Sequence, residues 1–172
     1  DMVALAATQT TVRVQAEKLD ADPWLLNCQN GTIDLHTGEL RPHRRKDLIS
    51  RCCPVKYDAS ATAPRWELFL HEILDGDAEL IGFLQRAVGY SLTGTTEEKA
   101  VFVPFGSGDN GKTTLLSTFL HLLEEYSMLL QVDTLMVRQE SNNTQADLAD
   151  LRGARFVMTS ETEEGQRLAQ GK

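Results

Sequence analysis

Short β-favouring runs separated by turn residues occupy the first quarter of the chain. Runs at 24–28 and 32–35 are separated by Asn30-Gly31, and a turn at 36–39 separates the second run from Leu40. Asn-Gly between two such runs is the strongest short-range signal for a β-hairpin. We therefore predict a β-meander over 24–42, followed by another short strand over 48–55.

The apolar positions take a helical period after Pro64. Apolar side chains recur every three or four residues, at Trp66, Phe69, Leu70, Ile73 and Leu74. Pro64 suits a first helical position, and Asp75-Gly76 is typical of a helix end. A second amphipathic helix is predicted from Asp77, with the apolar face Leu80, Ile81, Phe83, Leu84, Ala87 and Val88. We interpret the aromatic residues of both helices as core and 91–96 as a connector.

An apolar run at 100–105 precedes a glycine-rich segment at 106–114. The run predicts a buried strand. A helix from Thr113 to about Glu124 is predicted by the inward-facing set Leu115, Leu116, Phe119, Leu120 and Leu123. Further strands are predicted over 126–132 and 154–159, with a short helical segment over 146–151. Strands that alternate with helices predict an α/β fold.

Composition sets limits on the kind of protein. Of the 172 residues, 41% are apolar, which is enough for a sizeable core. No apolar stretch approaches the roughly 20 residues of a membrane span, and the start of the chain lacks the features of a signal peptide. We therefore expect a cytoplasmic protein without a membrane partner. The three cysteines lack C-x-x-C spacing and indicate small buried side chains rather than disulfides or zinc.

The charge is acidic overall but includes one dense basic segment. The formal net charge of −8 argues against coating of DNA by the whole surface. It leaves open an enzyme that carries its basic residues only in a channel. The basic segment is 41–46, Arg-Pro-His-Arg-Arg-Lys. We interpret it as a solvated turn between strands, with contact to phosphate as the alternative.

The segment 106–114 matches the P-loop pattern G-x-x-x-x-G-K-[ST]. Small residues let backbone N–H groups close around a phosphate, and the following helix directs its positive end at the same anion. Lys112 is expected to reach the β/γ-phosphates, and the Thr113 hydroxyl to bind Mg²⁺. The alternative is a surface loop that ends in a solvated lysine. The candidate nucleotide-binding residues are Gly106, Ser107, Gly108, Asp109, Asn110, Gly111, Lys112, Thr113 and Thr114.

A candidate carboxylate follows the strand predicted over 154–159. In open α/β sheets ligands bind outside the carboxyl ends of the strands, which would bring Glu161 near the phosphates and the metal. A carboxylate there can hold hydrated Mg²⁺ or polarise the attacking water. We therefore predict that Glu161 and Lys112 are catalytic, and that Glu161 binds Mg²⁺ indirectly. The alternative for Glu161 is a capping residue on a solvated turn. Glu163 and Glu164 are interpreted as surface charge.

Several motifs in combination resemble the phage/plasmid primase-helicase family, whose members carry a superfamily 3 helicase module similar to that of the poxvirus primase-helicase. The resemblance begins near Asp20 and covers nearly all of the remaining chain. The motifs are Asp22-Pro23-Trp24-Leu25-Leu26-Asn27, Asn30-Gly31-Thr32-Ile33-Asp34-Leu35, Thr37-Gly38-Glu39-Leu40, Phe83-Leu84-Gln85-Arg86, Gly89-Tyr90-Ser91-Leu92-Thr93-Gly94, the segment 106–114 and the segment 151–162.

The resemblance implies an AAA+-like P-loop NTPase core. It divides the chain into an accessory β-rich region at 1–58, a helical region at 59–97 and the first half of the core at 98–172. The family's phosphate-binding positions carry over to Gly106, Gly111, Lys112 and Thr113, and its Walker B carboxylate to Glu161. Asn110 also fits the family's loop. The family usually has two adjacent acids at Walker B, whereas this chain has Ser160-Glu161.

The family implies an ATP-dependent DNA helicase, with ATP and Mg²⁺ as cofactors, that replicates a phage or plasmid in the bacterial cytoplasm. The expected partners are single-stranded or forked DNA and further copies of the chain in a hexameric ring. Two alternatives share the P-loop. A phosphotransferase would need an acceptor site and lid arginines, and neither is visible. A non-catalytic module would bind nucleotide only to hold an assembly together.

The family's DNA-contacting segment, sensor asparagine and arginine finger follow the Walker B strand, and the chain stops at Lys172. The sensor strand would lie between 101–105 and 156–159. We therefore expect these 172 residues alone to hydrolyse ATP poorly and not to unwind DNA.

Overall fold

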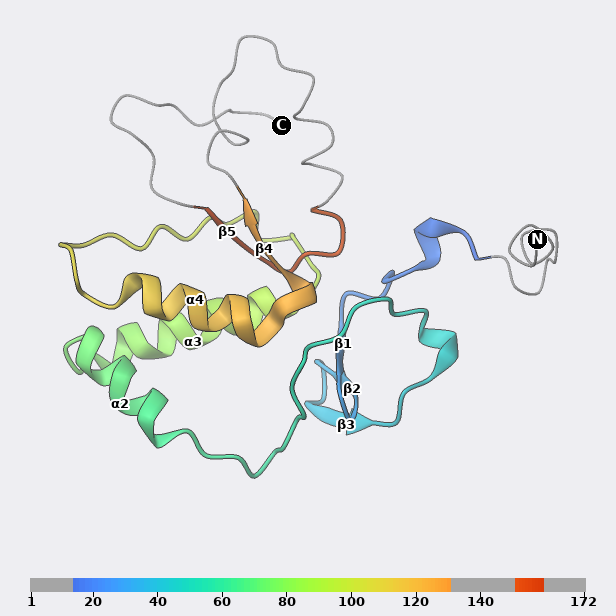
Figure 1. Cartoon of the computed structure of the whole chain (residues 1–172), viewed down its shortest axis with the longest axis horizontal. Helices are drawn as coiled ribbons and strands as arrows, with labels where there is room; N and C mark the ends of the chain where they lie inside the picture. Colours follow the sequence, from blue (N-terminus) through green and yellow to red (C-terminus); the bar gives the residue numbers. More distant parts are fainter. Residues whose placement is uncertain (1–13, 131–150, 160–172) are drawn as a thin grey trace, which may run out of the picture.

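The computed structural model describes residues 14–130 and 151–159 of the chain. Within these residues a small antiparallel sheet, three α-helices and a two-stranded parallel sheet give a mixed α/β structure. Helix α4 lies between the α2–α3 pair and the parallel sheet, and the antiparallel sheet lies to the other side of a long connection (Figure 1). None of the described helices has the length and apolar character that crossing a membrane requires.

The predicted β-meander is confirmed. It consists of β1 (Leu25–Cys28), β2 (Gly31–Asp34) and β3 (Glu39–Arg41), which are antiparallel in sequence order. Ile33 of β2 lies opposite Leu26 of β1 on one side and opposite Leu40 of β3 on the other. The Asn-Gly turn between β1 and β2 lies where the local sequence signal placed it.

The prediction of a strand over 48–55 is wrong. A 3-10 helix, η2 (Arg45–Asp47), precedes this segment, and Leu48 has a left-handed backbone with φ 51°. This segment bonds to Asp20 instead: the Leu48 carbonyl accepts from the Asp20 N–H, and the Ser50 N–H and hydroxyl both donate to the Asp20 carboxylate. Only Cys53 makes an isolated parallel bridge, to Cys28. As predicted, Cys28 and Cys53 are buried, while Cys52 is half-buried.

Both predicted amphipathic helices are confirmed. Helix α2 (Pro64–Ile73) begins at its proline, and α3 (Ala78–Leu92) begins after Asp77, whose carboxylate accepts from the N–H groups of Glu79 and Leu80 at 2.9 and 3.0 Å. Such a cap stabilises a helix start by about 1 kcal/mol. Helix α3 continues two residues into the predicted connector, which therefore starts at Thr93 rather than Ser91.

The strand predicted over 100–105 is absent, since this segment has no ladder partner among the described residues. Its apolar side chains face solvent, and Val101 and Phe105 are 82% and 91% exposed. A β-strand satisfies its backbone N–H and C=O groups only through a neighbouring strand. Apolar sequence alone therefore did not make this segment a strand.

The remaining core elements follow the prediction. Helix α4 (Lys112–Leu123) leads through the 3-10 helix η3 (Glu124–Tyr126) into β4 (Ser127–Leu130), which pairs in parallel with β5 (Phe156–Thr159). Leu115, Phe119 and Leu123 of α4 are buried, and Leu116 and Leu120 are half-buried. Residues 131–132 of the predicted strand and 146–150 of the predicted helical segment lie outside the described residues.

Two groups of side chains hold these elements together. A buried cluster joins the meander to the end of α4 and contains Leu26, Cys28, Ile33, Cys53, Leu123 and Tyr126. A row of aromatic contacts runs from α2 through α4 to β5, with ring centroids 5.6 Å apart for Trp66–Phe119 and 5.7 Å for Phe119–Phe156. The interpretation of the helix aromatics as core holds only in part, because Trp66 and Phe69 are half-buried and Phe83 is 49% exposed.

Candidate nucleotide-binding loop

The glycine-rich loop, defined as residues 106–111, ends against helix α2. Gly111 precedes α4 with φ 82°, a left-handed backbone angle that residues other than glycine rarely adopt. A Cβ at this position would lie 2.6 Å from Ile73 Cγ2 and 3.3 Å from Phe69 Cε2. Both the turn into α4 and the contact with α2 therefore require glycine here.

Lys112 turns back over the glycine-rich loop. Its Nζ donates to the carbonyl oxygens of Gly106 and Ser107 at 3.0 Å each, and to Asn110 Oδ1 at 2.8 Å. An ammonium group has three donors, so these three oxygens satisfy it completely. The Asn110 side chain also lies close against Gly106, where a Cβ would collide with Asn110 Nδ2. Lys112, Asn110 and Gly106, all candidate nucleotide-binding residues, thus lie together at this loop.

The donors of this loop fit an anionic ligand. The ammonium of Lys112 and the unpaired N–H groups at the start of a twelve-residue helix lie at adjoining positions of the chain. No acidic side chain occupies the first turn of α4, so no carboxylate of that turn competes for these N–H groups. A phosphate bound here would exchange with the loop oxygens that now accept from Lys112. The residues present therefore fit a nucleotide phosphate.

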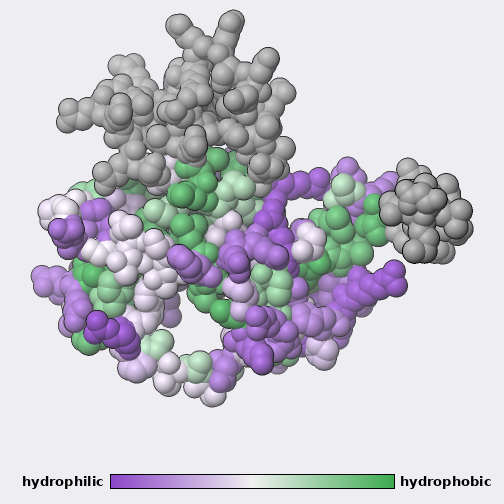
Figure 2. Space-filling model, viewed as in Figure 1, coloured by the Kyte–Doolittle hydropathy of each residue, from purple (hydrophilic) through white to green (hydrophobic). Residues whose placement is uncertain are grey.

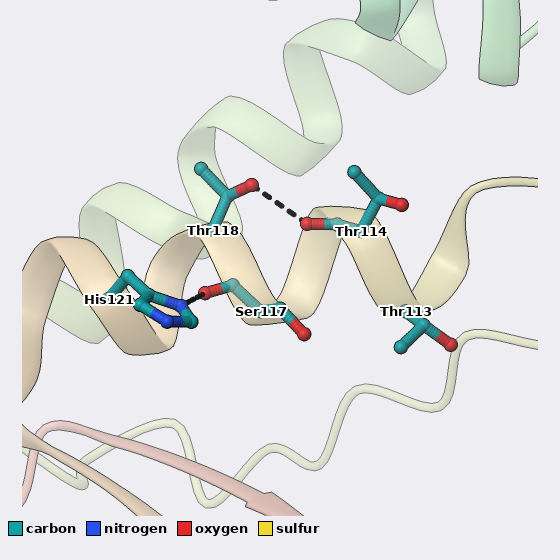
Figure 3. A pocket seen from close by; sticks show the side chains of 5 residues that line it. All are labelled: Thr113, Thr114, Ser117, Thr118 and His121. Carbon is teal, nitrogen blue, oxygen red and sulfur yellow. Dashed lines mark hydrogen bonds between the residues drawn. The ribbon is translucent and has the colours of Figure 1, made fainter.

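An open hollow of about 500 Å³ follows the exposed face of α4 beyond the loop (Figure 3). It is lined by Thr113, Thr114, Ser117, Thr118 and His121. The Thr118 hydroxyl donates to the Thr114 carbonyl at 2.7 Å, and His121 Nδ1 lies 2.7 Å from the Ser117 carbonyl. These polar groups are bonded to their own helix. The Thr113 hydroxyl makes no hydrogen bond within the described residues, which leaves it free for a hydrated cation.

Glu161 lies outside the described residues, so its role stays a prediction. The strand that precedes it in the sequence, β5, is described. Helix α4 leads away from the glycine-rich loop, β4 returns, and β5 is parallel to β4, so β5 runs back toward the loop side (Figure 1). The last described residue of β5 is Thr159. The chain is therefore directed toward the loop two residues before Glu161.

The structure also brings together a polar group that sequence reasoning missed. Arg155 donates to the carbonyl oxygens of Leu92 and Leu25 at 2.6 and 2.7 Å, and its guanidinium lies 4.7 Å from the centre of the Tyr126 ring. The Tyr126 hydroxyl donates to the Arg51 carbonyl at 3.1 Å and accepts from the Asn27 N–H at 3.2 Å. We call Arg155 and Tyr126 the Arg–Tyr junction.

The Arg–Tyr junction ties the meander to α3 and the parallel sheet without a carboxylate. No acidic side chain of the described residues forms an ion pair with Arg155. Burial lowers the pKa of Arg155 and raises the pKa of Tyr126 to about 12. The charge is compensated by two carbonyl dipoles and a ring face. No local pattern could identify this arrangement, because its members lie on segments far apart in the chain.

Gly111→Ala should damage the loop, whereas Gly108→Ala should not. Alanine at a left-handed φ costs roughly 1–2 kcal/mol, and the collision with Ile73 and Phe69 adds to that cost. A Cβ on Gly108 meets no atom within 4 Å. We expect a loss of about 2–4 kcal/mol in unfolding free energy for Gly111→Ala, measured by urea denaturation. Equal effects of the two substitutions would contradict the contact with α2.

Comparisons with known proteins agree with the resemblance stated above. A family model described as "D5 N terminal like" matches residues 1–75. A "Putative helicase" of Acanthamoeba polyphaga mimivirus is 28% identical over 142 residues, and a "Putative helicase" of Invertebrate iridescent virus 3 is 24% identical over 144 residues. Each match covers 80% of this chain and 15% of the relative, so the chain spans about one seventh of the length of these relatives. The resemblance of the chain to the primase-helicase family is thereby confirmed.

Proposed function

We propose that this chain is part of an ATP-dependent DNA helicase of a replication protein, with ATP and Mg²⁺ as cofactors. The observation that carries the proposal is the glycine-rich loop. Lys112 donates to the carbonyl oxygens of this loop, and α4 begins directly after it. A lysine and the free N–H groups of a helix start, next to a glycine-rich loop, are the donors that bind nucleotide phosphates. The names of the viral relatives support a helicase rather than another class of P-loop protein.

The main residues of the proposed site have distinct proposed roles. The backbone N–H groups near Gly111 and the ammonium of Lys112 bind the phosphates and stabilise charge that develops on them. Thr113 is proposed to contribute its hydroxyl to hydrated Mg²⁺. Glu161 is proposed to orient and deprotonate the attacking water. Because the backbone of Gly111 lies close to Ile73 of α2, we propose that a movement of the loop on nucleotide binding is transmitted to the helical pair.

The proposed partners are DNA and further copies of the protein. Single-stranded or forked DNA is the substrate that a replicative helicase must bind. A ring, proposed to be hexameric, would enclose one strand and provide residues from one subunit to the nucleotide of the next. Most of these contacts are proposed to involve parts of the protein beyond this chain, because its relatives are far longer.

Glu161→Gln tests the proposal in the full-length protein. We expect this variant to bind ATP with unchanged affinity and to lose at least about 100-fold in turnover, because the amide keeps the size of the side chain but cannot accept a proton. Strand separation should be lost with it. Glu163→Gln is the matched control and should retain both activities. Unwinding by Glu161→Gln at the parent rate, with Glu163→Gln inactive, would place the catalytic carboxylate elsewhere.

A further inference from the structure

Positive charge is concentrated in one short stretch of an acidic chain. Residues 41–51 contain five Arg and Lys residues and a single acid, Asp47, whereas the whole chain has a net charge of −8. Repulsion within such a stretch is unfavourable unless something compensates it.

Two acidic side chains, Asp47 and Asp20, form hydrogen bonds with residues of this stretch. Asp47 Oδ2 accepts from Arg41 Nη1 at 2.7 Å, which is the one ion pair recorded in 14–130 and 151–159. Asp20 accepts from the backbone N–H and the hydroxyl of Ser50. These contacts fix both ends of the intervening loop. Asp47 is ion-paired with Arg41, and Asp20 bonds to Ser50 rather than to a basic side chain of the loop.

The basic loop, defined as residues 42–46, presents three of the remaining charges to solvent, whereas Arg51 donates to the carbonyl oxygens of Glu125 and Arg152. His43, Arg44, Arg45 and Lys46 are all exposed, and none forms an ion pair with the described residues. Two backbone bonds close the turn beneath them, from the Asp47 N–H to the Arg44 carbonyl at 3.0 Å and from the Leu48 N–H to the Arg45 carbonyl at 3.3 Å. The surface over η2 is strongly hydrophilic in the space-filling view (Figure 2).

The chemistry of the basic loop favours nucleic acid over a membrane. Arginine binds phosphate oxygens through two parallel N–H donors, and two of the three fixed charges are arginines. The loop has no large apolar side chain to insert between lipids, which surface binding to a bilayer generally needs. We propose that the basic loop binds the phosphate backbone of a nucleic acid strand.

This contact would be separate from the candidate nucleotide-binding loop. The two loops lie at opposite ends of the described structure, with η2 near one end of the long axis and the start of α4 near the other (Figure 1). Nucleic acid binding by the basic loop would form part of the DNA contact in the proposed function, but it would not depend on ATP hydrolysis. It gives the meander a role of its own, which is to hold a strand of nucleic acid away from the glycine-rich loop.

A charge-removal variant tests the proposal in the complete chain. Arg44→Gln, Arg45→Gln and Lys46→Gln are combined, and binding to a labelled oligothymidine and to a labelled duplex is measured by fluorescence anisotropy over a range of salt. Each phosphate contact contributes about 0.7 to the salt slope for a single strand, so the slope should fall by about 2. Affinity at low salt should fall by at least about tenfold, with an unchanged circular dichroism spectrum.

The matched control removes the same charge from exposed positions elsewhere, as Arg65→Gln, Arg86→Gln and Lys99→Gln. It should bind within about twofold of the parent. Equal losses in both variants would overturn the proposal, since the effect would then be net charge alone. Retention of the parent affinity and salt slope by the basic-loop variant would also overturn it. So would binding of the parent chain to phosphatidylserine vesicles but not to either nucleic acid. Failure of ATP hydrolysis in the parent would leave these outcomes unaffected.

Discussion

Replacing Lys112 with alanine should abolish ATP hydrolysis by the full-length protein while leaving the fold intact. In the proposed site, its ammonium is the one side-chain cation of the glycine-rich loop and the first turn of α4. Loss of a single preorganised donor to developing charge typically costs 10²–10³-fold in turnover. We expect a loss of at least about 100-fold, measured as release of inorganic phosphate with and without DNA.

The fold should tolerate this change for a reason visible in the loop. The Lys112 ammonium bonds only to oxygens of residues 106, 107 and 110, so its removal frees oxygens that solvent can reach. The unfolding free energy should therefore change by less than about 1 kcal/mol. Lys56→Ala, at an exposed position, is the matched control and should keep normal turnover. If Lys112→Ala hydrolysed ATP at the parent rate, the glycine-rich loop would not be a catalytic phosphate site.

Replacing Arg155 with methionine should cause a large loss of stability. The substitution removes the donors to the carbonyl oxygens of Leu25 and Leu92, and it removes the cation above the Tyr126 ring. A hydrogen bond to a charged group contributes about 1.5–3 kcal/mol, and an oxygen left buried without a donor adds its own cost. We expect a decrease of about 3 kcal/mol in unfolding free energy, measured by urea denaturation.

Two further variants separate the geometry of the junction from its charge. Arg155→Lys keeps the charge, but a single ammonium lacks the planar fork with which Arg155 reaches carbonyls on two different elements, so its loss should be intermediate. Arg152→Met removes an exposed guanidinium three residues away, whose recorded bond is to the Ala16 carbonyl, and should cost less than about 0.5 kcal/mol. Equal losses for Arg155→Met and Arg152→Met would mean that the junction does not hold the meander to the parallel sheet.

The nine residues of the candidate site are contiguous, which is why their grouping could be predicted. The hydrogen bonds inside the loop could not be predicted in this way. That Lys112 donates to Asn110, and that Gly111 packs on Ile73, depends on how the loop and α2 come together. The Arg–Tyr junction was missed for the same reason, because Arg155, Leu25 and Leu92 come together only through tertiary packing.

Local chemistry in the sequence determined where the elements of this protein begin and end. Asn30-Gly31 set the first hairpin, Pro64 and Asp77 started two helices, and Gly111 preceded the third. These signals act within a few residues, through backbone angles and capping bonds. The runs at 48–55 and 100–105 were also predicted as strands from their apolar residues, yet neither became a strand. A strand exists only where another strand satisfies its backbone, and that partner is decided by the tertiary structure.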